Sequence, residues 1–332
     1  VPLVSLGSIN LEPLKTLSIA RDLKRWIASW CSRTRAEGDT PQALVYNLGP
    51  THEQGGFLAG ICRSLQLPVV PLVTDLDYFG ANRFSWRFWR FRWQRRLLCE
   101  AQAVVALNPK VLEDFGREKP TLHVPGVVPN EVFFRKLLSL PSKQQGDGTT
   151  VFLYSGSFNR PRGIHRLLEA FPSLPSEKVC LRITGRGPEE DRVMKAAAEY
   201  DNIEYLGFLK SDQERLEAVS DADVLVNPHG IEVPEARYLF PSKLAEYLAS
   251  GRLVVSSFLP GMEAFPLKEM ILYEEDSAES LVEAMFSATE LSEKERFVKG
   301  ARAREWADTH FDWDRIAGEL LDFMERRVSS TR

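Results

Sequence analysis

Three side chains suited to an anionic, hydroxyl-rich ligand lie within five residues of one another: Ser242, Lys243 and Glu246. A proline precedes them and Gly251 stands where a left-handed C-terminal cap is wanted, so the pattern predicts a helix that begins at Ser242. Free N–H groups and the helix dipole favour an anion at this helix start, and the Lys243 ammonium adds positive charge. Glu246 follows one turn later. The pattern fits a phosphate with a sugar beside it, and a surface turn with an intrahelical Lys–Glu pair is the alternative.

A second candidate anion site follows the apolar strand predicted over residues 150–155. The loop 156–163 begins and ends with glycine, contains Arg160 and Arg162, and leads into an amphipathic helix. A strand, a glycine-flanked loop and a helix in this order predict a phosphate cradle. The loop is not a Walker loop, because no Gly-Lys-Ser/Thr follows, and Pro188 after Gly187 excludes a G-x-G-x-x-G fingerprint.

Candidate acid–base and metal-binding residues lie in two loops of the first half. Apolar runs at 43–47 and 68–74 predict parallel strands whose carboxyl ends meet at one crevice. His52 lies in the loop after the first strand and could transfer a proton. Asp75 and Asp77 follow the second strand as a D-x-D pair, which can hold a divalent metal. A loop or capping role is the alternative, because no motif supplies further oxygen ligands.

Residues 83–96 alternate arginines with aromatic residues and include no acidic residue. A helix here has an aromatic face bordered by guanidinium groups, as in helices that lie in a membrane interface. The residues expected to contact a membrane or a lipid-linked acceptor are Trp86, Trp89, Arg90 and Trp93. Packing of the aromatics on the sheet, with the arginines in solvent, is the alternative. The pattern also suits single-stranded nucleic acid, but a net charge of -4 argues against a nucleic-acid partner.

The bulk properties predict a two-domain, cytoplasmic α/β protein. A chain of 332 residues is long for one core, and helical and strand patterns alternate along it. The four cysteines show no Cys-x-x-Cys spacing, so neither a disulfide framework nor a zinc site is indicated. The sequence contains no run of about 18 or more apolar residues, so no membrane-spanning helix is predicted. The expected domains are 1–140 and 150–310, with a polar linker at 141–149 and a C-terminal helix at 311–328 packing back on the first domain.

Five segments resemble the GT-B glycosyltransferases, specifically the retaining family-four type that includes many capsule, exopolysaccharide and glycolipid enzymes. These segments are Tyr46-Asn47, Ala103-Val-Val-Ala-Leu-Asn108, Val128-Pro-Asn-Glu-Val-Phe-Phe134, Tyr154-Ser-Gly-Ser157 with Arg162-Gly163, and Phe240 to Gly251. The resemblance implies two doubly wound Rossmann-like domains facing across a cleft, with the nucleotide-sugar donor on the second, the acceptor on the first, and no metal cofactor. It places Arg162, Ser242 and Lys243 on the diphosphate, Glu246 on the ribose and Phe208 near the base. The expected donor-binding residues are Gly156, Ser157, Arg162, Arg186, Phe208, Ser242, Lys243, Leu244 and Glu246.

The chain departs from this family at three places. The family often has two glutamates separated by seven residues, but Tyr238 stands eight positions before Glu246. Either Glu232 or Glu235 replaces the first glutamate, or this branch lacks it. The histidine that often follows the second strand is absent, with Asp75 near that place. The glycine-rich opening turn is also absent, so we expect the first domain to lack its opening strand, helix and strand.

These observations predict an enzyme that moves a sugar from a UDP- or GDP-sugar to a carbohydrate or lipid-linked acceptor with retention of configuration. The catalytic candidates are Asp75, His52 and Glu235. A second hypothesis is a metal-dependent transferase that uses Asp75 and Asp77. A third is a catalytically silent nucleotide-sugar or glycan binding protein, favoured by the missing glutamate and histidine. An anionic membrane surface at the cytoplasmic face is a further expected partner.

Overall fold

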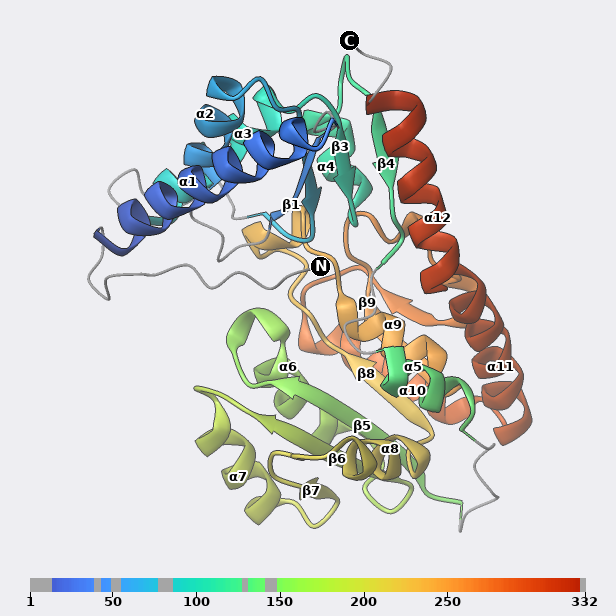
Figure 1. Ribbon diagram of the computed structural model, residues 1–332. Helices are drawn as coiled ribbons and strands as arrows, with labels where there is room; N and C mark the ends of the chain where they lie inside the picture. Colours follow the sequence, from blue (N-terminus) through green and yellow to red (C-terminus); the bar gives the residue numbers. More distant parts are fainter. Residues whose placement is uncertain are drawn as a thin grey trace. The chain divides into compact units, whose positions relative to one another are not determined.

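The computed structural model describes residues 14–38, 43–48, 55–76, 86–126, 131–140 and 148–328 (Figure 1). These residues form two compact units. Unit 1 comprises residues 1–124, 237–240 and 314–332, and unit 2 comprises residues 125–236 and 241–313. The first unit therefore ends at Val124, whereas the sequence predicted that it would end at residue 140. Most of the expected linker, residues 141–147, lies outside the described residues.

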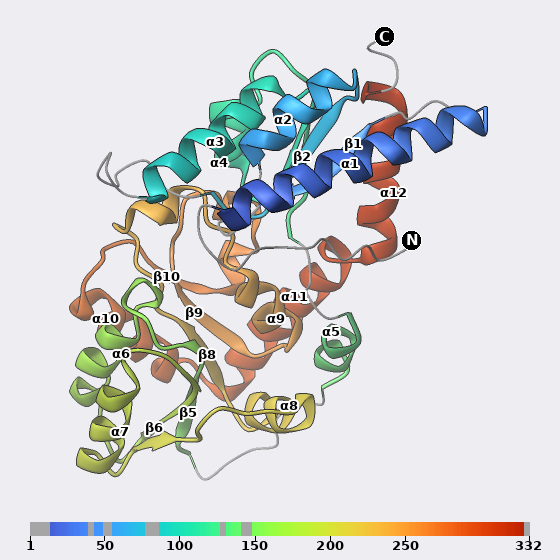
Figure 2. The ribbon, with the colours of Figure 1, turned by 60° about the vertical axis from the view of Figure 1, so that its left-hand side comes forward.

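Unit 1 contains a four-stranded parallel sheet in the order β1-β2-β3-β4. The strands are β1 (Leu44–Leu48), β2 (Val69–Val73), β3 (Val104–Ala106) and β4 (Thr121–His123). The helices are α1 (Leu14–Ala36), α2 (Gly55–Ser64), α3 (Trp86–Glu100), α4 (Pro109–Phe115) and most of α12 (Trp313–Phe323). Helix α2 contacts both α1 and α3 (Figure 2). The near-continuous apolar runs predicted buried parallel strands, and two of the four strands, β2 and β3, are largely buried.

Helix α3 contains the arginine- and tryptophan-rich segment. Phe91 is buried in the unit 1 core, while Arg92, Arg95 and Arg96 are exposed. This part of the helix therefore packs its aromatic residue inward and keeps its arginines in solvent. The side chains of Trp86, Trp89 and Arg90 lie outside the described residues, and Trp93 is half-buried. Within the part of the chain that the structure covers, no helix is long and apolar enough to cross a membrane.

A short segment of the second half, residues 237–240, belongs to unit 1. The Asn108 amide donates hydrogen bonds to the carbonyls of Arg237 at 3.2 Å and Leu239 at 2.9 Å. The Tyr238 hydroxyl donates to Asp114 at 2.8 Å, and its ring belongs to the unit 1 core. Buried backbone groups need partners, and these bonds supply them.

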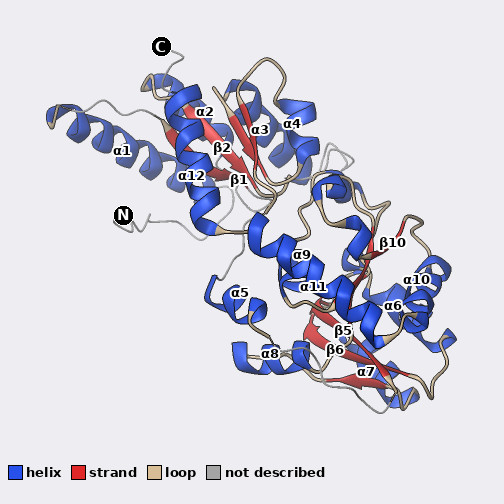
Figure 3. Cartoon of the chain, turned by 90° about the vertical axis from the view of Figure 1, so that its right-hand side faces the viewer, coloured by secondary structure: helices blue, strands red, loops and turns tan. Residues whose placement is uncertain are grey.

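Unit 2 contains a six-stranded parallel sheet in the order β10-β9-β8-β5-β6-β7 (Figure 3). The strands are β5 (Thr150–Ser157), β6 (Val179–Arg186), β7 (Ile203–Tyr205), β8 (Val224–Asn227), β9 (Leu253–Ser257) and β10 (Ile271–Tyr273). The helices are α5 (Glu131–Leu138), α6 (Ile164–Ala170), α7 (Glu190–Glu199), α8 (Asp212–Ser220), α9 (Ser242–Ala249), α10 (Ala278–Glu290) and α11 (Glu293–His310). The predicted alternation of strands and helices is confirmed in this unit.

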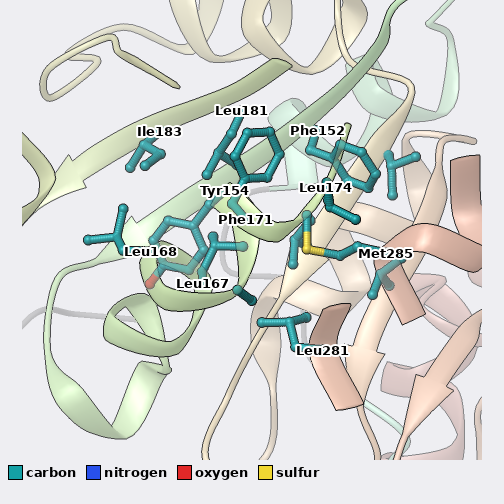
Figure 4. Close-up of a cluster of buried hydrophobic side chains, with 14 of the residues drawn as sticks. Phe152, Tyr154, Leu167, Leu168, Phe171, Leu174, Leu181, Ile183, Leu281 and Met285 are labelled. Carbon is teal, nitrogen blue, oxygen red and sulfur yellow. The ribbon is translucent and has the colours of Figure 1, made fainter. Parts of the chain in front are cut away.

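The core of unit 2 lies between the sheet and the helices that cover it. Figure 4 shows Phe152 and Leu181 from the strands packed with Phe171 and with Met285 of α10. The rings of Phe152 and Phe171 meet edge to face at 6.2 Å between centroids. This core fixes the carboxyl ends of β5 and β6, where the candidate site lies.

Helix α5 packs on the rest of unit 2 through its apolar side chains. Phe133, Phe134 and Leu137 are buried at helical spacing on its inner face. Phe134 packs edge to face on Phe311 at 6.2 Å, and Arg135 forms an ion pair with Asp312 at 3.1 Å. These contacts lie within unit 2, which explains why the unit boundary precedes the helix.

Candidate functional site

A pocket of about 400 Å³ opens at the carboxyl ends of β5, β6 and β7 in unit 2. It is lined by Ser155, Gly156, Ser157, Thr184, Gly185, Arg186, Phe208, Leu209, Lys210, Asp212, Arg215 and Lys243. The chain runs from β5 through β6 to β7 and then returns to the other side of β5 as β8. Ligands of doubly wound sheets bind where the strand order reverses in this way. The pocket therefore lies beside the switch point of its sheet.

Helix α9 is bonded to the end of β5 through two side chains. The Lys243 ammonium donates a hydrogen bond to the Ser155 carbonyl. The Tyr247 hydroxyl donates to the same carbonyl at 3.2 Å and accepts from the Ser155 N–H at 3.1 Å. Burial, together with the positive charges of Arg162 and Arg215, lowers the pKa of Lys243 to about 8 against the attraction of Glu246.

The glycine-flanked loop after β5 brings a second positive charge to this region. The Asn159 side chain accepts a hydrogen bond from the Arg162 N–H at 3.2 Å, so the loop forms a short helical turn. Gly163 has a left-handed φ of 75°, and a Cβ there would lie 1.5 Å from the Pro228 carbonyl oxygen. Only glycine allows this approach of the two loops. No carboxylate among the described residues pairs with the Arg162 guanidinium, which keeps its charge available to a ligand.

An aromatic ring and a guanidinium form the far wall of the pocket. The Arg186 guanidinium lies 4.4 Å from the centre of the Phe208 ring. Phe208 is 49% exposed, which is unusual for a phenylalanine and leaves one face of the ring open. Such a pair provides a stacking surface for a planar group.

Glu246 lies in a small recess that shares Ser155, Thr184, Leu209 and Arg215 with the pocket. Its Oε2 atom accepts a hydrogen bond from Arg215 Nη2 at 3.0 Å. Sequence reasoning missed Arg215, because it belongs to an ordinary amphipathic helix and only packing brings that helix beside α9.

Residues 149–290 match the family model described as glycosyl transferases group 1. These residues include the whole sheet of unit 2 and every residue that lines the pocket. The chain contains a group 1 glycosyltransferase domain and has the GT-B fold. The predicted fold class and the prediction of an enzyme are both confirmed.

Solved structures share the fold of this glycosyltransferase over most of its length. Sucrose-phosphate synthase from Thermosynechococcus elongatus is 19% identical, with a TM-score of 0.68 over 99% of this chain and 84% of that one. HepE from Anabaena in complex with UDP is 15% identical, with a TM-score of 0.67 over 96% and 85% of the two chains. Trehalose-6-phosphate synthase from Burkholderia multivorans is 11% identical, with a TM-score of 0.67 over 97% and 79%. No curated protein matches the glycosyltransferase by sequence.

The glycosyltransferase brings five of the nine expected donor-binding residues together in the pocket: Gly156, Ser157, Arg186, Phe208 and Lys243. Glu246 lies in the adjoining recess. Ser242 is exposed at the start of α9, as the capping pattern predicted. The side chain of Leu244 is fully buried and its N–H donates to the Pro241 carbonyl at 2.8 Å. Its role as a donor contact remains a prediction.

The catalytic candidates remain predictions. The Asp75 carboxylate accepts a hydrogen bond from the Phe240 N–H at 3.0 Å and so helps to hold residues 237–240 in unit 1. His52, Asp77 and the side chain of Glu235 lie outside the described residues. Across the described ranges, no three His, Cys, Asp or Glu side chains form a group that could hold a metal ion.

The loop after β8 contains a buried histidine that the sequence did not single out. His229 is 1% exposed, and its Nδ1 atom lies 3.0 Å from the Gly230 carbonyl. Burial lowers the pKa of His229 to about 4, and Arg162 contributes in the same direction. The ring is therefore neutral at pH 7. Because a carbonyl only accepts, Nδ1 holds the proton.

A buried ion pair holds the same loop. Asp276 accepts hydrogen bonds from Arg166 and from the Ile231 N–H, the latter at 3.0 Å. Burial alone would raise the pKa of the Asp276 carboxyl, but these hydrogen bonds and the charge of Arg166 keep it below its ordinary value. The loop is therefore fixed next to Arg162.

Proposed function

We propose that the glycosyltransferase moves a sugar from a UDP- or GDP-sugar to a carbohydrate or lipid-linked acceptor, with retention of anomeric configuration. The observation that carries the proposal is the pocket at the strand ends, which combines Lys243 at one wall with the Arg186–Phe208 pair at the other. A diphosphate would pair with the charge of Lys243, and a planar base would stack on the Arg186–Phe208 pair. HepE, which shares the fold, has been solved with UDP and with UDP and glucose.

The proposed mechanism stabilises the leaving diphosphate with fixed positive charge. Lys243, Arg162 and the first N–H groups of α9 supply that charge. At pH 7 the Lys243 ammonium is mostly protonated, because its pKa of about 8 lies above that pH. Loss of one such group should cost about 2–4 kcal/mol of transition-state stabilisation. Glu246 is assigned to the ribose hydroxyls, because a carboxylate is a strong acceptor of hydrogen bonds from hydroxyl groups.

No metal cofactor is part of this proposal, because the cations of unit 2 take the role that a metal has in other diphosphate sites. The alternative is a metal held by Asp75 and Asp77. Activity that disappears with EDTA and returns with a divalent cation supports the alternative. Activity that is unchanged by EDTA supports the proposal.

A ligand screen and a product assay test the function. The thermal midpoint should rise with UDP or GDP and with the corresponding sugar nucleotide, and less with UMP or GMP, which lack the second phosphate. Transfer is then measured with mixed acceptors, and the anomeric configuration of the product is read by NMR. An inverted product contradicts retention. Turnover of Lys243→Ala within twofold of the parent contradicts the diphosphate assignment.

We also propose that unit 1 contacts an anionic membrane at the cytoplasmic face. Helices α1, α2 and α3 contain only two acidic residues, Asp22 and Glu100. Among the side chains that the structure describes, the exposed cations of these helices are Arg21, Lys24, Arg25, Arg33, Arg35, Arg63, Arg92, Arg95 and Arg96. Basic helices bind anionic lipid by charge as well as by apolar contact. Failure to sediment with anionic vesicles at low salt would contradict this contact.

A further inference from the structure

Arg215 of α8 makes three contacts that fix its guanidinium plane. Nη2 donates to Glu246 Oε2 at 3.0 Å, and Nη1 donates to Asp212 Oδ1 at 3.3 Å. The Cζ atom lies 3.9 Å from the centre of the Phe133 ring. Phe133 is 2% exposed and belongs to α5, so the ring is itself held in the core. A planar guanidinium that bridges two carboxylates and stacks on a ring is strongly oriented.

The contact with Arg215 occupies only one oxygen of Glu246. None of the described residues donates a hydrogen bond to Oε1. Arg215 also lines the 400 Å³ pocket, and the Glu246 recess opens beside it. A hydroxyl donor that enters from the pocket can therefore bind Oε1 while Arg215 holds Oε2.

We propose that Arg215 is a positioning residue, which together with Phe133 orients the Glu246 carboxylate so that its free oxygen accepts a ribose hydroxyl. The inference rests on the proposed nucleotide donor and deepens it. It implies that the glycosyltransferase distinguishes ribose from deoxyribose through a residue that does not touch the sugar. Arg215 should therefore affect the recognition of the ribose hydroxyl and leave the diphosphate contact intact.

Calorimetric titration with UDP and 2′-deoxy-UDP tests this inference, or GDP and its 2′-deoxy form if the ligand screen selects GDP. A hydrogen bond to a charged carboxylate predicts that the parent prefers the ribose form by about tenfold or more. In Arg215→Met the preference should fall below about threefold, while the affinity for the deoxy form stays close to that of the parent. Glu246→Gln should lose the same preference, and Arg215→Met in that background should add nothing.

Arg182 offers a matched control in the same unit. Its guanidinium also bridges two carboxylates, Glu204 at 2.8 Å and Asp221 at 3.4 Å, but it does not line the pocket. Arg182→Met should leave the ribose preference unchanged. If Arg215→Met does not fold, Phe133→Leu removes only the stacking ring and should still lower the preference, though by less.

The outcomes separate this inference from the proposed function. A parent that binds no nucleotide diphosphate refutes the proposed donor and, with it, this role of Arg215. A parent that binds and prefers ribose, with the full preference retained in Arg215→Met, overturns the role of Arg215 alone. Tighter UDP binding by Arg215→Met also overturns it, because Arg215 would then compete with the ribose for Glu246.

Discussion

The Tyr247 hydroxyl pairs both backbone groups of Ser155, accepting from its N–H at 3.1 Å and donating to its carbonyl at 3.2 Å. One side chain of α9 thereby closes the end of β5, where the pocket begins. Tyr247→Phe leaves the Ser155 N–H without this partner, so we expect the free energy of unfolding to fall by about 1–3 kcal/mol. Urea unfolding measures the change. Tyr200→Phe is the control, because the Tyr200 hydroxyl bonds no described residue, and an equal loss in both variants would contradict the interpretation.

Lys243 should make nucleotide binding depend on pH. Its pKa of about 8 in the folded protein lies below the ordinary 10.5, so the unfolded chain binds more protons between these values and stability rises with pH across that window. A diphosphate needs the charged ammonium. Above pH 8 the affinity for UDP should therefore fall by roughly tenfold per pH unit. Calorimetry from pH 7 to 9.5 should show this fall in the parent and a flat profile in Lys243→Met.

Gly163 should tolerate no side chain. A Cβ at this position meets the Pro228 carbonyl oxygen at 1.5 Å, and its φ of 75° is unfavourable for other residues. We expect Gly163→Ala to lose on the order of 4–5 kcal/mol or to fail to fold. Gly148→Ala is the control, since Gly148 has a φ of 94° but open space around it, and only the backbone strain of about 1–2 kcal/mol should appear. Equal thermal midpoints would show that the close approach to Pro228 does not matter.

The buried pair of Arg166 and Asp276 should be costly to break. Their side chains are only 10% and 12% exposed. Asp276→Asn therefore leaves the charge of Arg166 in the interior without an opposite charge beside it. We expect a loss of about 3–5 kcal/mol in chemical denaturation. Glu169→Gln, which breaks an exposed pair with Arg192, should cost about 0–1 kcal/mol. Similar losses in the two variants would argue against a structural role for the buried pair.

The Asp276 carboxyl should also make the stability of the protein fall at acidic pH. The pKa of Asp276 is lower in the folded protein than its ordinary 3.8, so its stabilisation is complete well above that value and is lost as the pH falls through the folded pKa. The difference in stability between the parent and Asp276→Asn should be constant above about pH 5 and shrink below about pH 4. A difference that grows on acidification would contradict the assignment.

The sequence by itself determined the parallel sheets and the start of the α9 helix. Apolar runs and helical spacing are local, because each residue's partner in the pattern lies a few positions away. For this reason the helix beginning at Ser242, its glycine cap at Gly251 with a φ of 70°, and the loop before Gly163 could all be predicted. The resemblance to a family supplied the expected ligand.

Only the tertiary structure decided which side chains meet. Arg215 and Glu246 are 31 residues apart, and no spacing rule links two amphipathic helices that happen to pack side by side. Tyr238, eight residues before Glu246, lies in the core of unit 1 and not in the pocket of unit 2. Helix α5 depends on the burial of Phe133 and Phe134, which the surrounding sequence does not reveal. In each case the deciding free energy comes from burial and charge pairing between distant segments, which depends on the folded packing and leaves no periodic trace in the sequence.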